Sequence, residues 1–258
     1  MTDTNFDKNS GTKLYNHDEE IEKLILEHIE NFKAEPLSIL KNWQTFIRRQ
    51  PLKKFLLHYE LFLKTLNIPG DIIEFGVYRG QGLMTWANLL EARAIGNRTK
   101  TVYGFDNWKG FTGFSEEDGS ECEGAGKNLG GFNPSSFKSE LSNLISIFDK
   151  DRFIPWKKRI KLIDGQVEET IHPFLKDNPG LRFSLVHFDM DLYLPTKVAL
   201  EAIYDHVVSG GVIIFDEYAI PDWPGETKAV DQFLAKYPHL KLNTSEWTNA
   251  PAAWIIKP

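Results

Sequence analysis

After residue 70, short apolar runs alternate with helix-length stretches, and this alternation constrains the fold more than any other feature of the chain. The runs rich in β-branched and aromatic residues cover residues 72–75, 101–105, 160–163, 183–188 and 212–215. The stretches of helical length cover residues 81–95, 134–149, 167–177, 195–208 and 225–236. Near-continuous apolar strands separated by helices are typical of a mostly parallel sheet with helices on both faces. We therefore predict an α/β fold.

Two flanking regions complete this architecture. Apolar residues recur at three- and four-residue steps between residues 18 and 62, which predicts an N-terminal helical extension. Residues 1–13 show no such pattern and are predicted to be unstructured. At the other end of the chain, residues 241–243 and 252–256 predict an antiparallel hairpin that closes the sheet.

A long segment after the second predicted strand interrupts the alternation. Residues 107–133 hold seven glycines and three phenylalanines. Loops of more than about 12–15 residues in a compact domain are usually lids or binding loops. We therefore expect a lid here, and a surface insertion is the alternative. We divide the chain into a tail and helical extension over residues 1–66 and an α/β domain over residues 67–258.

Charge and cysteine content exclude several functional classes. The 258 residues carry 30 Lys and Arg against 36 Asp and Glu, a net charge of −6, whereas nucleic-acid-binding domains usually carry clustered basic residues. The single cysteine, Cys122, excludes an internal disulfide and a zinc site built from thiolates. The N-terminal region is polar and no apolar run approaches about 18 residues, so we expect no signal peptide, no membrane span and a cytoplasmic protein.

Ligands of open parallel sheets bind beyond the carboxyl ends of the strands, so the residues that follow each predicted strand are candidate site residues. The first strand leads into a turn with Gly76, Gly80 and Gly82, where backbone N–H groups can approach an anionic group. This spacing matches neither a dinucleotide-binding nor a phosphate-binding glycine motif, and a tight structural corner is the alternative. Asp106 ends the second strand, where an acid can bind a ribose diol or, alternatively, stabilise a turn.

Four acids follow the last two predicted parallel strands, namely Asp189, Asp191, Asp216 and Glu217. Asp189 and Asp216 are 27 residues apart, about one strand–helix–strand unit, so their strands should be neighbours about 4.8 Å apart. Such a concentration of negative charge requires that some acids be protonated or that a cation bind. Oxygen ligands favour Mg²⁺, with Mn²⁺ or Ca²⁺ as alternatives. In the structural alternative, Asp216 caps the following turn and Asp191 pairs with Lys197. We interpret His187 as a packed strand residue rather than a base, because it precedes the strand end.

Four motifs in this chain resemble those of class I S-adenosylmethionine-dependent methyltransferases. They occupy residues 74–80, 104–106, 189–196 and 210–218. The stretch Asp-x-Asp-Leu-Tyr-x-Pro-Thr at residues 189–196 is the most specific, and it is similar to metal-dependent sugar O-methyltransferases of the macrocin O-methyltransferase type. The resemblance implies a Rossmann-like class I methyltransferase fold.

The resemblance also implies a cofactor, a metal and a role for each matching residue. It implies that S-adenosylmethionine contacts Glu74, Gly76, Tyr78, Arg79, Gly80, Asp106, Asp164, Gly165, Gln166 and Asp189. It implies that Mg²⁺ is held by Asp189, Asp216 and Glu217, and that the catalytic residues are Asp189 and Asp191. In this scheme Asp106 binds the ribose, and Asp191 is the base near the acceptor hydroxyl.

The predicted reaction is methyl transfer to a sugar hydroxyl. Sugar hydroxyls are very weak acids, so a cation that polarises the oxygen and a carboxylate that takes the proton would together solve the problem at neutral pH. The acceptor would be a nucleotide sugar, a glycosylated natural product or a polysaccharide unit. The alternatives are a catechol-type O-methyltransferase that acts on a planar diol, an NAD-dependent nucleotide-sugar oxidoreductase and a non-catalytic scaffold.

We expect a homodimer or larger homo-oligomer without nucleic-acid or membrane partners. Residues 18–62 carry more apolar positions than one contact face needs, among them Leu37, Leu40 and Trp43. The family that the chain resembles is similarly oligomeric. The alternative is that these helices only cover the sheet.

Overall fold

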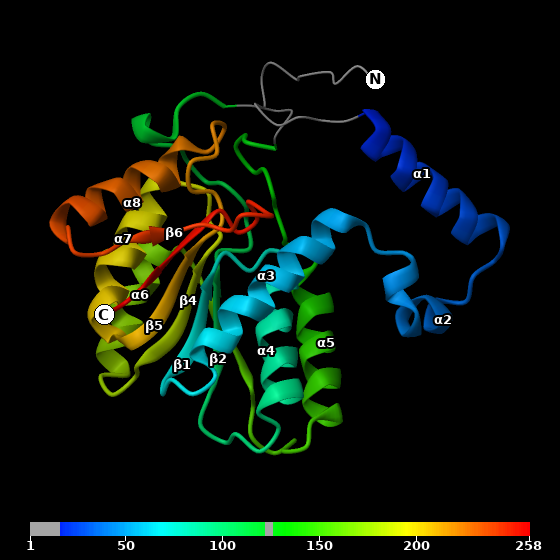
Figure 1. The fold of residues 1–258 in the computed structure, drawn as a ribbon, viewed down its shortest axis with the longest axis horizontal. Coiled ribbons are helices and arrows are strands. Elements are labelled where there is room, and N and C mark those ends of the chain that lie inside the picture. Colours follow the sequence, from blue (N-terminus) through cyan, green and yellow to red (C-terminus); the bar gives the residue numbers. More distant parts are fainter. Residues whose placement is uncertain (1–15, 122–125) are drawn as a thin grey trace.

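A seven-stranded sheet forms the centre of the computed structural model, which describes residues 16–121 and 126–258 (Figure 1). The parallel strands are β1 (Asp71–Phe75), β2 (Val102–Asp106), β3 (Ile160–Asp164), β4 (Phe183–Phe188) and β5 (Val207–Phe215). Strand β7 (Ala253–Ile256) pairs in antiparallel fashion with both β5 and β6 (Leu242–Asn243). The strand order is β3-β2-β1-β4-β5-β7-β6, so the predicted parallel sheet and closing hairpin are confirmed.

Helices cover both faces of the sheet, because successive strand residues point to opposite faces and both sets are apolar. The helices on one face are α3 (Arg49–Thr65), α4 (Gln81–Arg93) and α5 (Lys138–Asp151) (Figure 1). The helices on the other face are α6 (Val167–Asp177), α7 (Tyr193–Ile203) and α8 (Pro224–Lys236). In β1, for example, Ile72 packs in the core with α3 and α4, whereas Ile73 packs in the core with α6 and α7. Most residues within the central strands are therefore apolar, and the exceptions include Glu74 of β1 and His187 of β4.

The N-terminal region is helical, as the periodicity predicts. Before α3 it forms α1 (Asn16–Asn31), α2 (Pro36–Lys41) and a short 3-10 helix, η1 (Trp43–Thr45). In Figure 1, α1 and α2 extend away from the sheet. The predicted unstructured residues 1–13 lie outside the described part of the chain. None of the described helices is both long enough and apolar enough to cross a lipid bilayer.

The predicted helix over residues 195–208 is wrong at its end. A 3-10 helix, η4 (Tyr204–His206), follows α7, and β5 begins at Val207. The cause is strand pairing, because Val207 is aligned with Phe183 of β4. Pairing within the sheet therefore overrides the helical pattern of this segment, and β5 is longer than the predicted strand over residues 212–215.

Buried Lys100, which precedes β2, forms hydrogen bonds to the start of β1 and to β4 at the edge where the strands begin. The Lys100 ammonium donates hydrogen bonds to the carbonyl oxygens of Ile68 (2.7 Å) and Gly70 (2.8 Å), just before β1. It also donates to the hydroxyl of Ser184 in β4 at 2.6 Å. Because only 6% of Lys100 is exposed, loss of the ammonium would leave buried carbonyl oxygens without their charged donor.

We predict that Lys100→Met lowers the free energy of unfolding by about 2–4 kcal/mol, because hydrogen bonds from a buried charged donor are lost and their acceptors stay buried. Urea denaturation followed by circular dichroism measures the change. Lys158→Met is the matched control, since Lys158 is exposed, and it should change the free energy by less than about 0.5 kcal/mol. Equal stability of the two variants would contradict the assigned role of Lys100.

Candidate active site

A cavity of about 620 Å³ lies at the carboxyl edge of the parallel strands. The predicted site residues that line it are Glu74, Gly76, Tyr78, Arg79, Asp106, Gly165, Gln166, Asp189, Asp191, Asp216 and Glu217. Gly80 and Asp164 are not lining residues. Gly80 precedes α4 with a positive φ of 87°. The Asp164 carboxylate accepts hydrogen bonds from Trp108 Nε1 and Lys138 Nζ, each at 2.7 Å. The predicted cofactor contacts of Gly80 and Asp164 stay predictions.

The carboxyl ends of β1, β4 and β5 are joined by backbone hydrogen bonds just past the strands. The Asp189 N–H donates to the carbonyl oxygen of Phe75 at 2.9 Å, and the Asp216 N–H donates to that of Phe188 at 3.0 Å. The predicted neighbourhood of Asp189 and Asp216 is therefore confirmed. Their side chains come from adjacent strand ends and face the same cavity.

Asp191 lies two residues beyond Asp189, outside the regular strand. Its φ of 65° is in the left-handed region, which non-glycine residues seldom adopt and which is enriched at functional sites. The alternative pairing of Asp191 with Lys197 is not what the structure shows. Lys197 Nζ instead donates to the Tyr193 hydroxyl at 3.0 Å.

Lys54 of α3 contacts both aspartates at the strand ends, and the sequence analysis missed it. Its ammonium lies 2.7 Å from Asp216 Oδ2 and 3.2 Å from Asp189 Oδ2. Lys54 is 135 residues from Asp189 along the chain. Only the packing of α3 on the sheet brings the two together, so no local spacing could have indicated the contact.

His187 lies in the interior behind the acids and contacts two of them. Its Nδ1 is 3.0 Å from Glu74 Oε2, and its Nε2 is 3.4 Å from Asp216 Oδ1. Burial alone would lower the pKa of His187, but the hydrogen bonds to Asp216 and Glu74 outweigh it and raise the pKa to about 9. Glu74 Oε2 also accepts a hydrogen bond from Trp86 Nε1 at 2.8 Å. The charged imidazole ring of His187 thus links Glu74 of β1 to Asp216, which follows β5.

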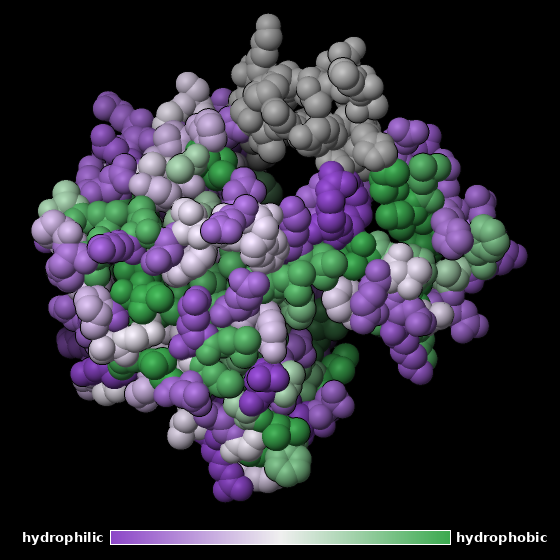
Figure 2. Space-filling model, in the orientation of Figure 1, coloured by the Kyte–Doolittle hydropathy of each residue, from purple (hydrophilic) through white to green (hydrophobic). Residues whose placement is uncertain are grey.

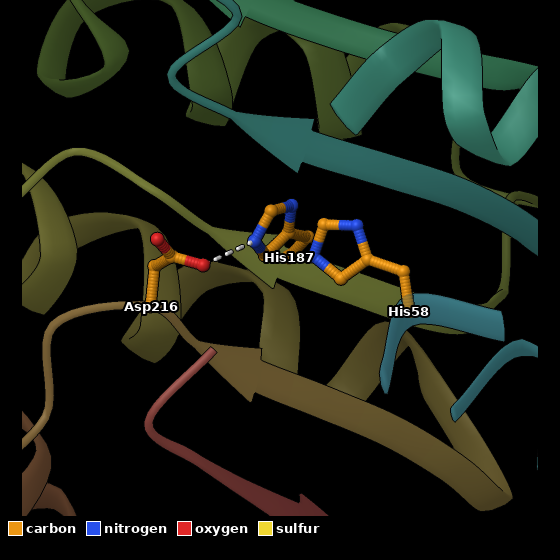
Figure 3. Close-up of side chains that lie close together, drawn as sticks. All are labelled: His58, His187 and Asp216. Carbon is orange, nitrogen blue, oxygen red and sulfur yellow. Dashed lines mark hydrogen bonds and ion pairs between the residues drawn. The ribbon is translucent and has the colours of Figure 1, made fainter. Parts of the chain in front are cut away.

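His58 of α3 lies beside His187 in the same buried cluster (Figure 3). Three possible ligand atoms, one from each of His58, His187 and Asp216, lie within 4.8 Å of one another. This spacing could hold a metal ion. Both ring nitrogens of His187, however, already contact carboxylates. Burial, together with the positive charge of His187, lowers the pKa of His58 well below its ordinary value. A neutral His58 packed 4.5 Å from the ring of Trp86 favours a supporting role for this cluster.

Burial and mutual repulsion raise the pKa of acids in the cavity wall. The pKa of Asp191 is well above its ordinary value because of burial and the charge of Glu217. Burial and the charge of Asp216 raise the pKa of Glu217 to about 8. Burial alone would also raise the pKa of Asp216, but Lys54 and His187 outweigh it and lower this pKa. The wall therefore holds more carboxyl groups than these two bases neutralise, which favours binding of a further cation.

The turn after β1 depends on Gly76 and Asp106. A Cβ at Gly76, where φ is 87°, would lie 1.8 Å from the carbonyl oxygen of Asp189, so only glycine allows this approach. Asp106 Oδ2 accepts hydrogen bonds from the N–H groups of Val77 (2.9 Å) and Tyr78 (2.8 Å). The turn-stabilising role of Asp106 is thus present in the structure. Its carboxylate also faces the cavity, so ribose binding stays a prediction.

The described part of the 107–133 segment forms one wall of the cavity. Its aromatic lining residues are Phe111, Phe114 and Phe132. Trp223, which directly precedes α8, lines the cavity beside them. Asp118 Oδ1 accepts a hydrogen bond from the Tyr193 N–H at 2.7 Å, which fastens the segment to the start of α7. Lys127 Nζ donates to the carbonyl oxygen of Asp118 and, at 2.8 Å, to that of Asp222. Residues 122–125 lie outside the described chain.

Curated relatives of the chain are O-methyltransferases. It is 26% identical over 175 residues to demethyldecarbamoylnovobiocin O-methyltransferase of Streptomyces niveus, a match that covers 66% of this chain but only 60% of that enzyme. It is 25% identical over 193 residues to 8-demethyl-8-(2,3-dimethoxy-alpha-L-rhamnosyl)-tetracenomycin-C 4'-O-methyltransferase of Streptomyces olivaceus, covering 72% and 69% of the two chains.

The fold matches solved methyltransferase structures over nearly its full length. The crystal structure of CalS11, a calicheamicin methyltransferase, is 27% identical and superposes with a TM-score of 0.88, covering 99% of this chain and 98% of that one. The apo structure of CalS11, described as a TDP-rhamnose 3'-O-methyltransferase, gives a TM-score of 0.81. The predicted class I methyltransferase fold is confirmed. The family model for macrocin O-methyltransferase (TylF) matches residues 43–243, and the chain therefore belongs to the macrocin O-methyltransferase family.

Proposed function

We propose that this protein transfers a methyl group from S-adenosylmethionine to a sugar hydroxyl. The observation that carries the proposal is the placement of Asp189, Asp191, Asp216 and Glu217 on the wall of one cavity, beside the turn at Gly76. The names of the relatives support it, because each names a methyltransferase and two name a rhamnose unit. The acceptor sugar we propose belongs to a nucleotide sugar, a glycosylated natural product or a polysaccharide unit.

We place the cofactor at the ends of β1 and β2. Glu74 and Gly76 would border its methionine part, and Asp106 would accept hydrogen bonds from its ribose hydroxyls. Gly165 and Gln166, which line the cavity beyond β3, would contact the adenine. The support for this placement is geometric, since these residues follow three adjacent strands of the sheet.

Methyl transfer forms a carbon–oxygen bond while the carbon–sulfur bond of the sulfonium breaks, and the hydroxyl proton must leave. The sulfonium methyl is already activated, so the protein has to align the acceptor oxygen and accept its proton. In our proposal Asp191 takes that proton. Asp191 lines the cavity two residues beyond the assigned metal ligand Asp189, which places it beside the space that we assign to the acceptor. The aromatic side chains of the 107–133 segment would exclude water and cover the apolar face of the sugar.

We propose that Asp189, Asp216 and Glu217 hold Mg²⁺, with Mn²⁺ or Ca²⁺ as alternatives. The residues fit a cation, because two of these carboxylates already bind the ammonium of Lys54 and all their donor atoms are oxygens. When bound, the metal would supply positive charge that makes the acceptor hydroxyl more acidic.

We also propose that the 107–133 segment acts as a lid over cofactor and acceptor. Its aromatic residues line the cavity, and hydrogen bonds of Asp118 and Lys127 hold it near α7 and α8. Movement of such a segment would admit the substrates and then exclude water.

The proposed ribose contact of the cofactor can be tested at Asp106. Asp106→Ala should weaken S-adenosylmethionine binding by about 1–3 kcal/mol, because charge-assisted hydrogen bonds to the ribose are lost. Isothermal titration calorimetry measures the affinity. Asp177→Ala, an exchange at the last residue of α6 away from the cavity, is the control and should bind as the wild type does. Unchanged affinity of Asp106→Ala would remove this residue from the cofactor site.

A second prediction separates the ligand from the base. Asp189→Asn should weaken Mg²⁺ binding, and part of its activity should return when the metal concentration is raised. Asp191→Asn should keep metal and cofactor affinity while kcat falls by about 10²–10⁴, the usual contribution of a positioned general base. Kinetics across a Mg²⁺ series, with calorimetry of both ligands, distinguish the two responses.

The opposite pattern, in which metal rescues Asp191→Asn but not Asp189→Asn, would reverse the two assignments. EDTA should abolish wild-type activity, and added Mg²⁺ should restore it. Full activity of the wild type in EDTA would overturn the metal part of the proposal and leave methyl transfer itself to be judged by product analysis.

We further propose that the protein self-associates through its N-terminal helices. Figure 2 shows apolar surface on α1, and the exposed fractions there include 51% for Leu24 and 73% for Phe32. In the following segment Leu37 is 61% and Leu40 is 70% exposed. Several large apolar side chains exposed to water on helices that project from the body of the molecule support an association surface here.

Light scattering at micromolar concentration should therefore give a dimer mass for the wild type and a monomer mass for Leu40→Asp. The free energy needed to bury the aspartate charge in the interface exceeds the free energy that the leucine contact contributes to association. Leu144→Asp, on the exposed side of α5 with 46% exposure, should keep the wild-type mass. A monomer mass for the wild type would contradict the association.

A further inference from the structure

Lys54 occupies the position that a metal would need. Its ammonium binds the Oδ2 atoms of Asp216 and Asp189 at 2.7 and 3.2 Å. The side chain of Asp216 is 6% exposed and that of Asp189 is 31% exposed. Two oxygens that we assign to a divalent cation are therefore already engaged by a positive charge from the protein itself.

The position of this ammonium is fixed by the packing of α3. One helical turn beyond Lys54 the helix buries Leu57 and His58, and further along it buries Leu61. His58 and Lys54 are four residues apart, so they lie on the same face of the helix. His58 packs with its ring centroid 5.1 Å from that of His187, which sets the distance of this helix face from the strand ends.

From this geometry we infer that Lys54 and a divalent cation compete for Asp189 and Asp216, so that Lys54 sets the metal affinity of the site. This inference rests on the proposed function. A metal bound at these oxygens would lie close to the ammonium, and the repulsion between them would be twice that between two single charges. Metal binding therefore displaces the ammonium, and the long side chain of Lys54 gives it the freedom to move.

This competition lowers the affinity of the site for a metal ion. Without a metal, the ammonium compensates part of the negative charge of the two carboxylates. Glu217, the third ligand we assign, makes no ion pair with Lys54 among those found in the described residues. A cation that binds Glu217 therefore displaces the ammonium only from the other two acids.

The test is the affinity of the full-length protein for Mn²⁺, measured from the loss of the free-ion signal in electron paramagnetic resonance at fixed pH and ionic strength. Lys54→Met should bind Mn²⁺ about 10- to 100-fold more tightly than the wild type, the equivalent of one charge-assisted hydrogen bond. Lys54→Arg retains the charge and should stay as weak as the wild type. The matched control is Lys53→Met, because Lys53 is exposed and contacts the carbonyl oxygen of Trp247; its affinity should not change.

Asp216→Asn, tested in parallel, distinguishes failure of this inference from failure of the proposed metal site. If Asp216→Asn loses Mn²⁺ binding while Lys54→Met binds no more tightly than the wild type, competition is overturned and the metal site stands. If Asp216→Asn binds as the wild type does, the assigned metal site itself is wrong, and the competition falls with it. Thermal melting shows whether Lys54→Met is folded, and Lys54→Gln, which retains a hydrogen-bond donor without the charge, replaces it if not.

Discussion

The accumulation of carboxyl groups at one edge of the sheet is the constraint on which the rest of the site depends. Burial and mutual repulsion of these acids oppose folding unless positive groups reach them. His187 supplies one such group from within the sheet, where it is aligned with Glu74 of β1. Lys54 supplies another from α3. Removal of one member of a buried ion pair leaves its partner uncompensated, so α3 is held to the sheet by charge as well as by its apolar face.

Much of the fold and part of the site follow from local sequence patterns. The central strands were predictable because both of their faces are buried, which makes each a near-continuous apolar run. Asp189 and Asp216 were predictable as neighbours because parallel strands that are joined by one helix usually lie side by side. The extent of β5 was not predictable, since the pairing of Val207 with Phe183 depends on the assembled sheet.

The contacts that complete the site depend on tertiary structure. Periodicity identified α3 as a helix but gave no reason to single out Lys54, whose partners lie far along the chain. His187 was correctly interpreted as a packed residue, but its contacts with Glu74 and Asp216 require the order of three strands. At Asp106 the two interpretations from sequence were not exclusive, because a carboxylate that stabilises a turn keeps lone pairs for other donors.

The wall built by the 107–133 segment has a consequence for how this architecture changes over evolutionary time. Its aromatic side chains border the cavity, and the segment is joined to the body by the hydrogen bond of Asp118 with the start of α7 and by ring contacts of Phe111 and Phe132 with Trp223. The acids at the ends of β4 and β5, and the bases Lys54 and His187 that contact them, lie outside this segment. Replacement of the segment between its anchors would therefore reshape the space that we assign to the acceptor and leave the acids at the strand ends in place, so that new acceptors could be explored while the proposed chemistry is kept.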